Sequence, residues 1–83
     1  MKTYDSQYLQ RMIRLTAEDM LENDDKATSE MIVYIADRLN QSYPDGDVDR
    51  ETIEQIMREP GYRDIDPDAD APAGLLDWLL DID

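Results

Sequence analysis

Apolar side chains recur three and four positions apart in several stretches of the chain, which is the spacing of one face of an α-helix. The first stretch predicts a helix over about residues 5–22, with a stripe of Tyr8, Leu9, Met12, Ile13, Thr16, Met20 and Leu21. The second predicts a helix over about residues 27–41 that buries Met31, Ile32, Ile35, Ala36 and Leu39. Val33 and Tyr34 fall off that stripe, so we expect the second helix to be covered on more than one side.

Polar residues mark the boundaries of these helices. Asp5 or Ser6 is a suitable N-cap for the first helix, and Asp25 or Thr28 for the second. The residues at 43–46, Tyr-Pro-Asp-Gly, predict a turn, because Pro presets φ and Gly adopts a positive φ readily.

A third helix is predicted to begin after Asp49, which is a good N-cap and is followed by Glu51 in the first turn. Val48 can pack on Ile53 across this helix start. The helix buries Ile53, Ile56 and Met57, and it ends by Glu59 because Pro60 and Gly61 cannot continue it.

The remaining residues predict an extended acidic loop over 61–71 and a last helix from near Pro72, with Leu75, Leu76, Trp78, Leu79, Leu80 and Ile82. The fold class is therefore all-α: a small bundle of three to four helices with an acidic extended loop before the last helix. We expect residues 1–83 to form a single acidic helical domain, because a chain of 83 residues is long enough for one core.

Composition excludes several kinds of chemistry. The chain has no His and no Cys, so a zinc site, a disulfide or a catalytic triad is not expected. Paired carboxylates need a cleft for acid–base work, and so small a bundle leaves little room for one. We expect no catalytic residues, no metal site, no cofactor and no enzymatic activity.

The charge of the chain predicts the kind of partner it has. With 8 Lys plus Arg against 21 Asp plus Glu, the formal net charge is −13. Such a chain repels nucleic acid and anionic membranes and attracts basic protein surfaces. The N-terminal residues lack the apolar run of a secretory signal, and no stretch has the roughly 20 apolar residues of a membrane span. We therefore expect a cytoplasmic protein that binds neither nucleic acid nor membrane directly.

Acidic residues are concentrated in the second half of the chain. Residues 1–42 have a balance of −3 and residues 43–83 a balance of −10, and from Asp64 to Asp83 there are seven acids and no base. The concentration favours a binding face, although a solvated surface that serves solubility or adaptation to salt would also be acidic. The predicted partner-binding residues are Asp64, Asp66, Asp68, Asp70, Asp77 and Asp81, with Tyr62 as an exposed aromatic anchor in the loop.

The alternating Asp run at 64–70 has two possible roles. In an EF-hand frame these Asp residues occupy early ligand positions, but Ala69 stands where Gly is needed and Leu75 where the bidentate Glu belongs. Asp45-Gly46-Asp47-Val48-Asp49 is a second EF-like order, and Thr52 ends that frame where Glu is needed. In an extended chain, by contrast, alternate carboxylates stand about 6 to 7 Å apart, which is of the order of neighbouring phosphates in nucleic acid. We therefore favour phosphate mimicry.

Two resemblances agree with that interpretation. Small size, strong acidity, absence of Cys and His, and clustered carboxylates resemble the small acidic inhibitors of phages and mobile elements that act as DNA mimics, including some anti-CRISPR and anti-restriction proteins. The segment 68–78, Asp-Ala-Asp-Ala-Pro-Ala-Gly-Leu-Leu-Asp-Trp, is similar to part of the colicin nuclease immunity proteins, which are acidic four-helix domains. Both resemblances imply an acidic face that occupies the basic groove of a nucleic-acid-handling protein.

Two hypotheses follow from the sequence. The first is an inhibitor or decoy that binds the basic surface of such a protein and blocks its substrate. The second is a non-enzymatic helical adaptor, or a homodimer, that associates through apolar helix faces while its charge serves solubility. Exposed Val33, Tyr34 or Leu80 would favour the second hypothesis, and its binding would be insensitive to salt.

Overall fold

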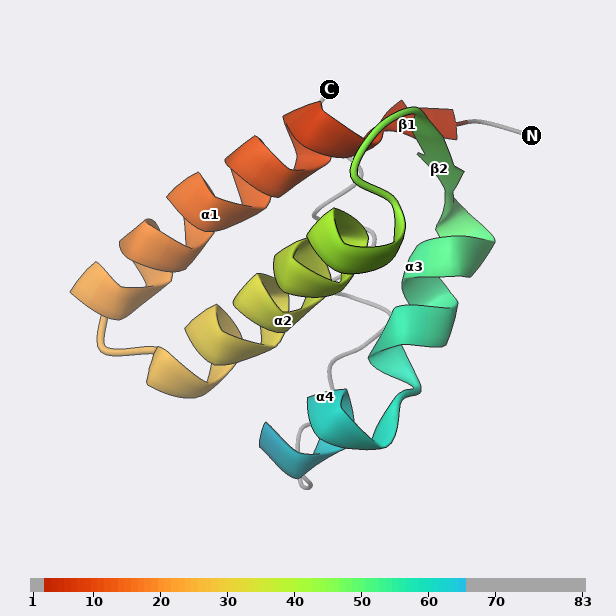
Figure 1. Ribbon diagram of the computed structural model, residues 1–83. Helices are drawn as coiled ribbons and strands as arrows, with labels where there is room; N and C mark the ends of the chain where they lie inside the picture. Colours follow the sequence, from red (N-terminus) through yellow and green to blue (C-terminus); the bar gives the residue numbers. More distant parts are fainter. Residues whose placement is uncertain (1–2, 66–83) are drawn as a thin grey trace.

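The computed structural model describes residues 3–65, in which four helices and a small two-stranded sheet follow one another (Figure 1). The elements are β1 (Thr3–Asp5), α1 (Ser6–Glu22), α2 (Lys26–Ser42), β2 (Asp47–Asp49), α3 (Arg50–Met57) and α4 (Pro60–Ile65). The predicted small helical bundle is confirmed at this level, and the sheet is an addition that the hydrophobic pattern does not predict. The last helix, predicted from near Pro72, lies outside the described residues.

The first two helices form an antiparallel hairpin with the predicted caps. The carboxylate of Asp5 accepts hydrogen bonds from the backbone N–H groups of Gln7 and Tyr8, at 2.9 and 3.2 Å. Asp25 accepts from the N–H of Thr28 at 3.2 Å. These bonds satisfy donors that have no partner within the helix, so each helix begins beside its predicted Asp.

Residues from every helix contribute to one buried core. Its members are Leu9, Ile13, Ala17, Met31, Ile32, Ile35, Ala36, Leu39, Val48, Ile53, Ile56, Met57 and Tyr62. The predicted cores of the second and third helices are thereby confirmed. In α1 the prediction is too broad, because Tyr8 and Leu21 are 43% and 53% exposed. A helix that packs against the core on one side only buries fewer of its apolar residues than their spacing predicts.

The sheet ties the start of the chain to the start of α3. β1 and β2 are antiparallel, and Tyr4 is opposite Val48, which is buried. Gly46 has a φ of 91°, and its carbonyl accepts a 2.9 Å bond from the N–H of Ser6. The predicted turn therefore brings two short strands together. The strands themselves could not be predicted, because three residues are too few to show an alternation of apolar and polar side chains.

The third helix agrees with its prediction, and the segment after it does not. Asp49 accepts a 2.8 Å bond from the N–H of Thr52, and the helix ends at Met57, before Pro60. The extended loop predicted over 61–71 is wrong for Gly61–Ile65, because α4 begins at Pro60. In the first turn of a helix the backbone N–H groups have no partner within the helix, so a proline, which has no N–H, is tolerated there. Pro60 therefore ends α3 and also begins α4.

Helix α2 lies in the middle of the described part. Figure 1 shows α1 on one side of it and α3 and α4 on the other, and α2 packs against all three. Val33 and Tyr34 are partly buried against the core, which confirms that α2 is covered on more than one side. None of the helices described within residues 3–65 is long and apolar enough to cross a membrane.

Candidate acidic interaction surface

Two of the seven predicted partner-binding residues lie in the described part of the chain. Asp64 is exposed and lies next to the last residue of α4. Tyr62 is also in α4, where its side chain is 2% exposed. Asp66, Asp68, Asp70, Asp77 and Asp81 lie outside the described residues. The arrangement that can be read from the structure therefore consists of Asp64 and of carboxylates that the sequence analysis did not select.

The prediction that Tyr62 is an exposed anchor is wrong. Its ring packs on Tyr34 edge to face, with the centroids 6.0 Å apart and the planes at 62°. Its hydroxyl is buried and has no hydrogen-bond partner among residues 3–65, and burial raises the pKa of Tyr62 to about 12. The turn of α4 directs Tyr62 inward, whereas its polar neighbours Gly61 and Arg63 suggested a loop. Tyr62 is a core residue.

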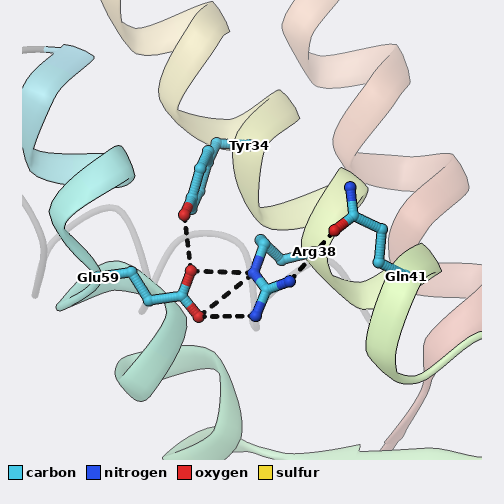
Figure 2. A network of polar contacts seen from close by, with 4 residues as sticks. All are labelled: Tyr34, Arg38, Gln41 and Glu59. Atoms are coloured by element: carbon cyan, nitrogen blue, oxygen red, sulfur yellow. Dashed lines mark hydrogen bonds and ion pairs between the residues drawn. The ribbon is translucent and has the colours of Figure 1, made fainter.

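A carboxylate at the start of α4 holds this corner of the fold in place (Figure 2). Glu59 accepts a 2.6 Å bond from the hydroxyl of Tyr34 and bonds of 2.9 and 3.1 Å from Nε and Nη2 of Arg38. The guanidinium of Arg38, and then the Tyr34 hydroxyl, lower the pKa of Glu59. The bond to Glu59 in turn raises the pKa of Tyr34. The network fixes α4 against α2 and positions Asp64 one turn later.

Four carboxylates gather around the sheet, and we call them the sheet-end carboxylates: Asp5, Asp45, Asp47 and Asp49. Asp5 and Asp47 are directly opposite each other in the sheet. Asp45 accepts a 2.7 Å bond from Nε2 of Gln7. The hydroxyl and N–H of Thr52 lower the pKa of Asp49. Like charges directly opposite each other on a sheet repel, so the rest of the fold must outweigh this repulsion to hold carboxylates from both halves of the chain together.

A second group lies at the other end of the helical hairpin, around its connecting turn. These turn-end carboxylates are Asp19, Glu22, Asp24 and Asp25. Asp24 has a φ of 63°, a left-handed conformation that Asp tolerates better than most residues. The 17 residues of α1 separate the two groups by about 25 Å, at a rise of about 1.5 Å per residue. Carboxylates therefore flank the hairpin at both ends, in addition to the acidic run that begins at Asp64.

Basic side chains are largely engaged with acids of the same domain. Ion pairs join Arg14 to Asp37 at 2.7 Å, Arg50 to Glu54 at 3.2 Å and Lys26 to Glu30 at 3.8 Å, beside the pair of Arg38 and Glu59. Residues 3–65 contain 15 acidic and 7 basic side chains, a balance of −8. These pairs occupy four of the seven bases, so most of the positive charge of the described residues is already engaged within the domain.

The carboxylates do not form a metal centre in the described part of the chain. Within residues 3–65 no group of three or more acidic side chains has the arrangement to hold a metal ion. The EF-like order at 45–49 is instead used for the turn, the strand and the cap of α3. The exposed carboxylates can accept hydrogen bonds from Lys and Arg of another molecule and form ion pairs with them.

Comparisons with protein-family models, with curated proteins and with solved structures gave no match. The resemblances to DNA-mimic inhibitors and to colicin immunity proteins therefore rest on the residues quoted for them. Sequence reasoning missed the sheet-end carboxylates, although a signal was present. Asp45, Asp47 and Asp49 alternate as Asp64, Asp66, Asp68 and Asp70 do, but the segment 45–49 was interpreted as a turn, a helix cap and a possible calcium loop, and not as part of a binding face.

Proposed function

We propose that this protein is an inhibitor that binds the basic nucleic-acid-binding surface of a partner and keeps the substrate away from it. A CRISPR effector, a restriction enzyme or another nuclease is the kind of partner proposed. The observation that supports this function most directly is the acidic surface: a net charge of −13, with most bases of the described part already paired within the domain. Such a surface attracts Lys and Arg over about 8 to 10 Å at physiological salt.

Spacing supports mimicry of a nucleic-acid strand. Asp47 and Asp49 flank the buried Val48 in β2 and lie on the opposite side of the extended strand; Asp47 is exposed, and Asp49 is half-buried with one carboxylate oxygen bonded to Thr52. At about 3.3 Å per residue they stand about 6 to 7 Å apart, which is of the order of adjacent phosphates. The proposed binding surface also includes Asp64, Asp66, Asp68, Asp70, Asp77 and Asp81. Its mechanism is exclusion: the carboxylates take the positions of phosphates in the partner's groove.

Several properties belong to the same proposal. The protein acts without catalysis or a cofactor, and it binds neither nucleic acid nor membrane itself. A nucleic-acid-handling partner works in the cytoplasm of a bacterium, so the proposed location is cytoplasmic. The affinity for the partner falls as the salt concentration rises, because salt screens the attraction between the carboxylates and the partner's Lys and Arg side chains.

The adaptor alternative makes different demands on the surface. It would be favoured by exposed Val33 or Tyr34, and both are half-buried against the core. Leu80, the third residue that would favour it, lies outside the described residues. Apolar side chains are exposed on α1 instead, at Tyr8, Leu15 and Leu21. The response of binding to salt therefore distinguishes the two functions, since an apolar interface is insensitive to salt.

A pull-down from bacterial lysate at low and at moderate salt tests the proposed function. The tagged native chain is compared with a variant in which Asp64, Asp66, Asp68 and Asp70 are changed to Asn. A control variant removes the same number of charges at positions outside the proposed surface, by Asp24→Asn, Glu30→Gln, Glu51→Gln and Glu54→Gln. We expect one nucleic-acid-binding protein that the native chain and the control retain at moderate salt and the Asn variant loses. Equal retention by all three would contradict the proposed surface.

A further inference from the structure

One helix of the fold carries an apolar stripe that faces away from the core. Tyr8, Met12 and Leu15 stand at positions i, i+4 and i+7 of α1, which places them on one face. Tyr8 is 43% and Leu15 51% exposed, and Met12 is half-buried. We call these three residues the outer stripe. Over seven residues it extends for about 10 Å along the helix.

The position of α1 explains why the outer stripe is uncovered. Figure 1 shows α1 at one edge of the described part, with α2 between it and α3 and α4. Leu9, Ile13 and Ala17 face α2 and the core, so the opposite side of α1 has no described element to pack on. Arg14, which lies between the two faces, is bound to Asp37 of α2.

Charges at the two ends of the outer stripe define what would cover it. At its first turn lie Asp5, which caps α1, and Asp45, which Gln7 holds at 2.7 Å. Beyond Leu15 the same face continues, at i+4 and i+7, with Asp19 and Glu22, both exposed. The stripe is thus apolar in the middle, bordered on one side by exposed Arg11 at i+3 from Tyr8, and anionic at both ends. Its complement is an apolar stripe with Lys or Arg at both ends.

A second copy of this chain is a poor complement. If two α1 helices paired through their outer stripes, carboxylates would meet carboxylates at each end, in the parallel and in the antiparallel arrangement alike. Two chains of net charge −13 also repel each other at long range. Charge complementarity therefore favours a basic partner over a homodimer.

We propose that the outer stripe is the docking surface for an amphipathic helix of the partner, apolar along one side and basic at both ends of that side. This inference rests on the proposed function and supplies what charge alone lacks. Exposed carboxylates steer a basic protein but select among basic proteins poorly, whereas a Tyr and a Leu in a desolvated contact provide specificity. Tyr8 of the outer stripe is thus the proposed aromatic anchor in place of Tyr62, which is buried in the core.

The test uses the full chain and a dye-labelled peptide of about 15 residues that forms a Leu and Lys amphipathic helix. Fluorescence anisotropy gives the dissociation constants for the native chain and for Leu15→Ala, Tyr8→Ala and Leu21→Ala. Leu21 is the matched control, because it is on α1 and equally exposed but points away from the outer stripe. A second peptide has the same composition and charge in scrambled order.

We expect Leu15→Ala and Tyr8→Ala each to weaken binding of the amphipathic peptide about tenfold, and Leu21→Ala to leave it unchanged. The scrambled peptide should bind more weakly to the native chain, with an affinity that none of the three variants alters. Equal losses for Leu15→Ala and Leu21→Ala, or equal binding of both peptides, would overturn the docking surface.

Four further results are distinguishable. Equal binding of both peptides, lost as salt rises, would overturn the stripe and leave the proposed function standing. No binding of either peptide at low salt would contradict the proposed function as well. Concentration-dependent self-association that Leu15→Ala abolishes would show that a second copy covers the stripe. A lower urea midpoint for Leu15→Ala than for Leu21→Ala would show that another segment of this chain does, and either result would overturn the proposal.

Discussion

Replacement of Tyr62 by Phe should stabilise the protein. The hydroxyl of Tyr62 is buried and has no hydrogen-bond partner in the described part of the chain, so on folding it loses its bonds to water without replacement there. An unpaired buried polar group costs about 1 to 3 kcal/mol. Tyr62→Phe removes that group but keeps the ring and its edge-to-face contact with Tyr34. We expect the free energy of unfolding to rise by at least about 1 kcal/mol, which raises the Tm of a domain of this size by about 4 to 8 °C.

Two other Tyr→Phe substitutions give this prediction its control. Tyr34→Phe removes the 2.6 Å bond to Glu59 and should destabilise the protein by about 1 to 2 kcal/mol. Tyr43 is 42% exposed and its hydroxyl can bind water, so Tyr43→Phe should change stability by less than about 0.5 kcal/mol. Urea unfolding followed by far-UV circular dichroism measures all three. A loss of stability in Tyr62→Phe comparable with that in Tyr34→Phe would refute the reasoning, because it would mean that the Tyr62 hydroxyl has a partner.

Alkaline pH provides an independent check of the same burial. Burial raises the pKa of Tyr62 to about 12, so the folded state holds the phenol neutral at a pH where the unfolded chain ionises it. Ionisation of Tyr62 therefore leaves the stability unchanged below about pH 10 and lowers it progressively as the pH rises to about 12. Tyr62→Phe should flatten the fall in stability over that range. Part of the fall should remain, because the pKa of Tyr34 is raised too.

Three smaller predictions concern the turn, the close packing of α4 and acid. Gly46→Ala should lower the free energy of unfolding by about 1 to 2 kcal/mol in urea, because Gly46 has a φ of 91°; an unchanged midpoint would contradict that conformation. Gly61→Ala should also destabilise, since its Cβ would come within 2.9 Å of the Tyr34 hydroxyl and 3.0 Å of a ring carbon; an unchanged urea midpoint would contradict this close approach. The pKa values of Asp49 and Glu59 are lowered, so the stability that their ionised forms contribute at neutral pH should be lost as the pH falls through these pKa values. The double variant Asp49→Asn, Glu59→Gln should therefore lose less stability between pH 7 and pH 3 than the native chain; an equal loss in urea unfolding would contradict this.

Helices with a strong periodic stripe and a good cap could be predicted from the sequence. The core of α2 and the start of α3 at Asp49 agree with the structure because each rests on interactions within a few residues. The pairing of β1 with β2 joins residues more than 40 positions apart, and neither strand is long enough to show alternation. Local patterns carry no information about such a contact.

The candidate site was harder to predict than the fold. Whether a single Tyr between Gly61 and Arg63 points to solvent depends on the turn of α4, and that turn depends on the bonds of Glu59 to α2. Gly61 contained the missing signal: it lies against the Tyr34 ring, where a side chain would collide. The exposure of Tyr8 and Leu15 likewise follows from the edge position of α1, which no property of α1 itself reveals.

Competition with nucleic acid tests the central claim most directly. The partner captured by the native chain is bound to a dye-labelled DNA duplex, and the chain is added at several DNA concentrations while anisotropy is followed. Exclusion predicts that the chain releases the duplex completely, and that the amount needed rises in proportion to the DNA concentration. The variant with Asn at 64, 66, 68 and 70 should release little. A complex that contains partner, duplex and chain together would contradict the claim.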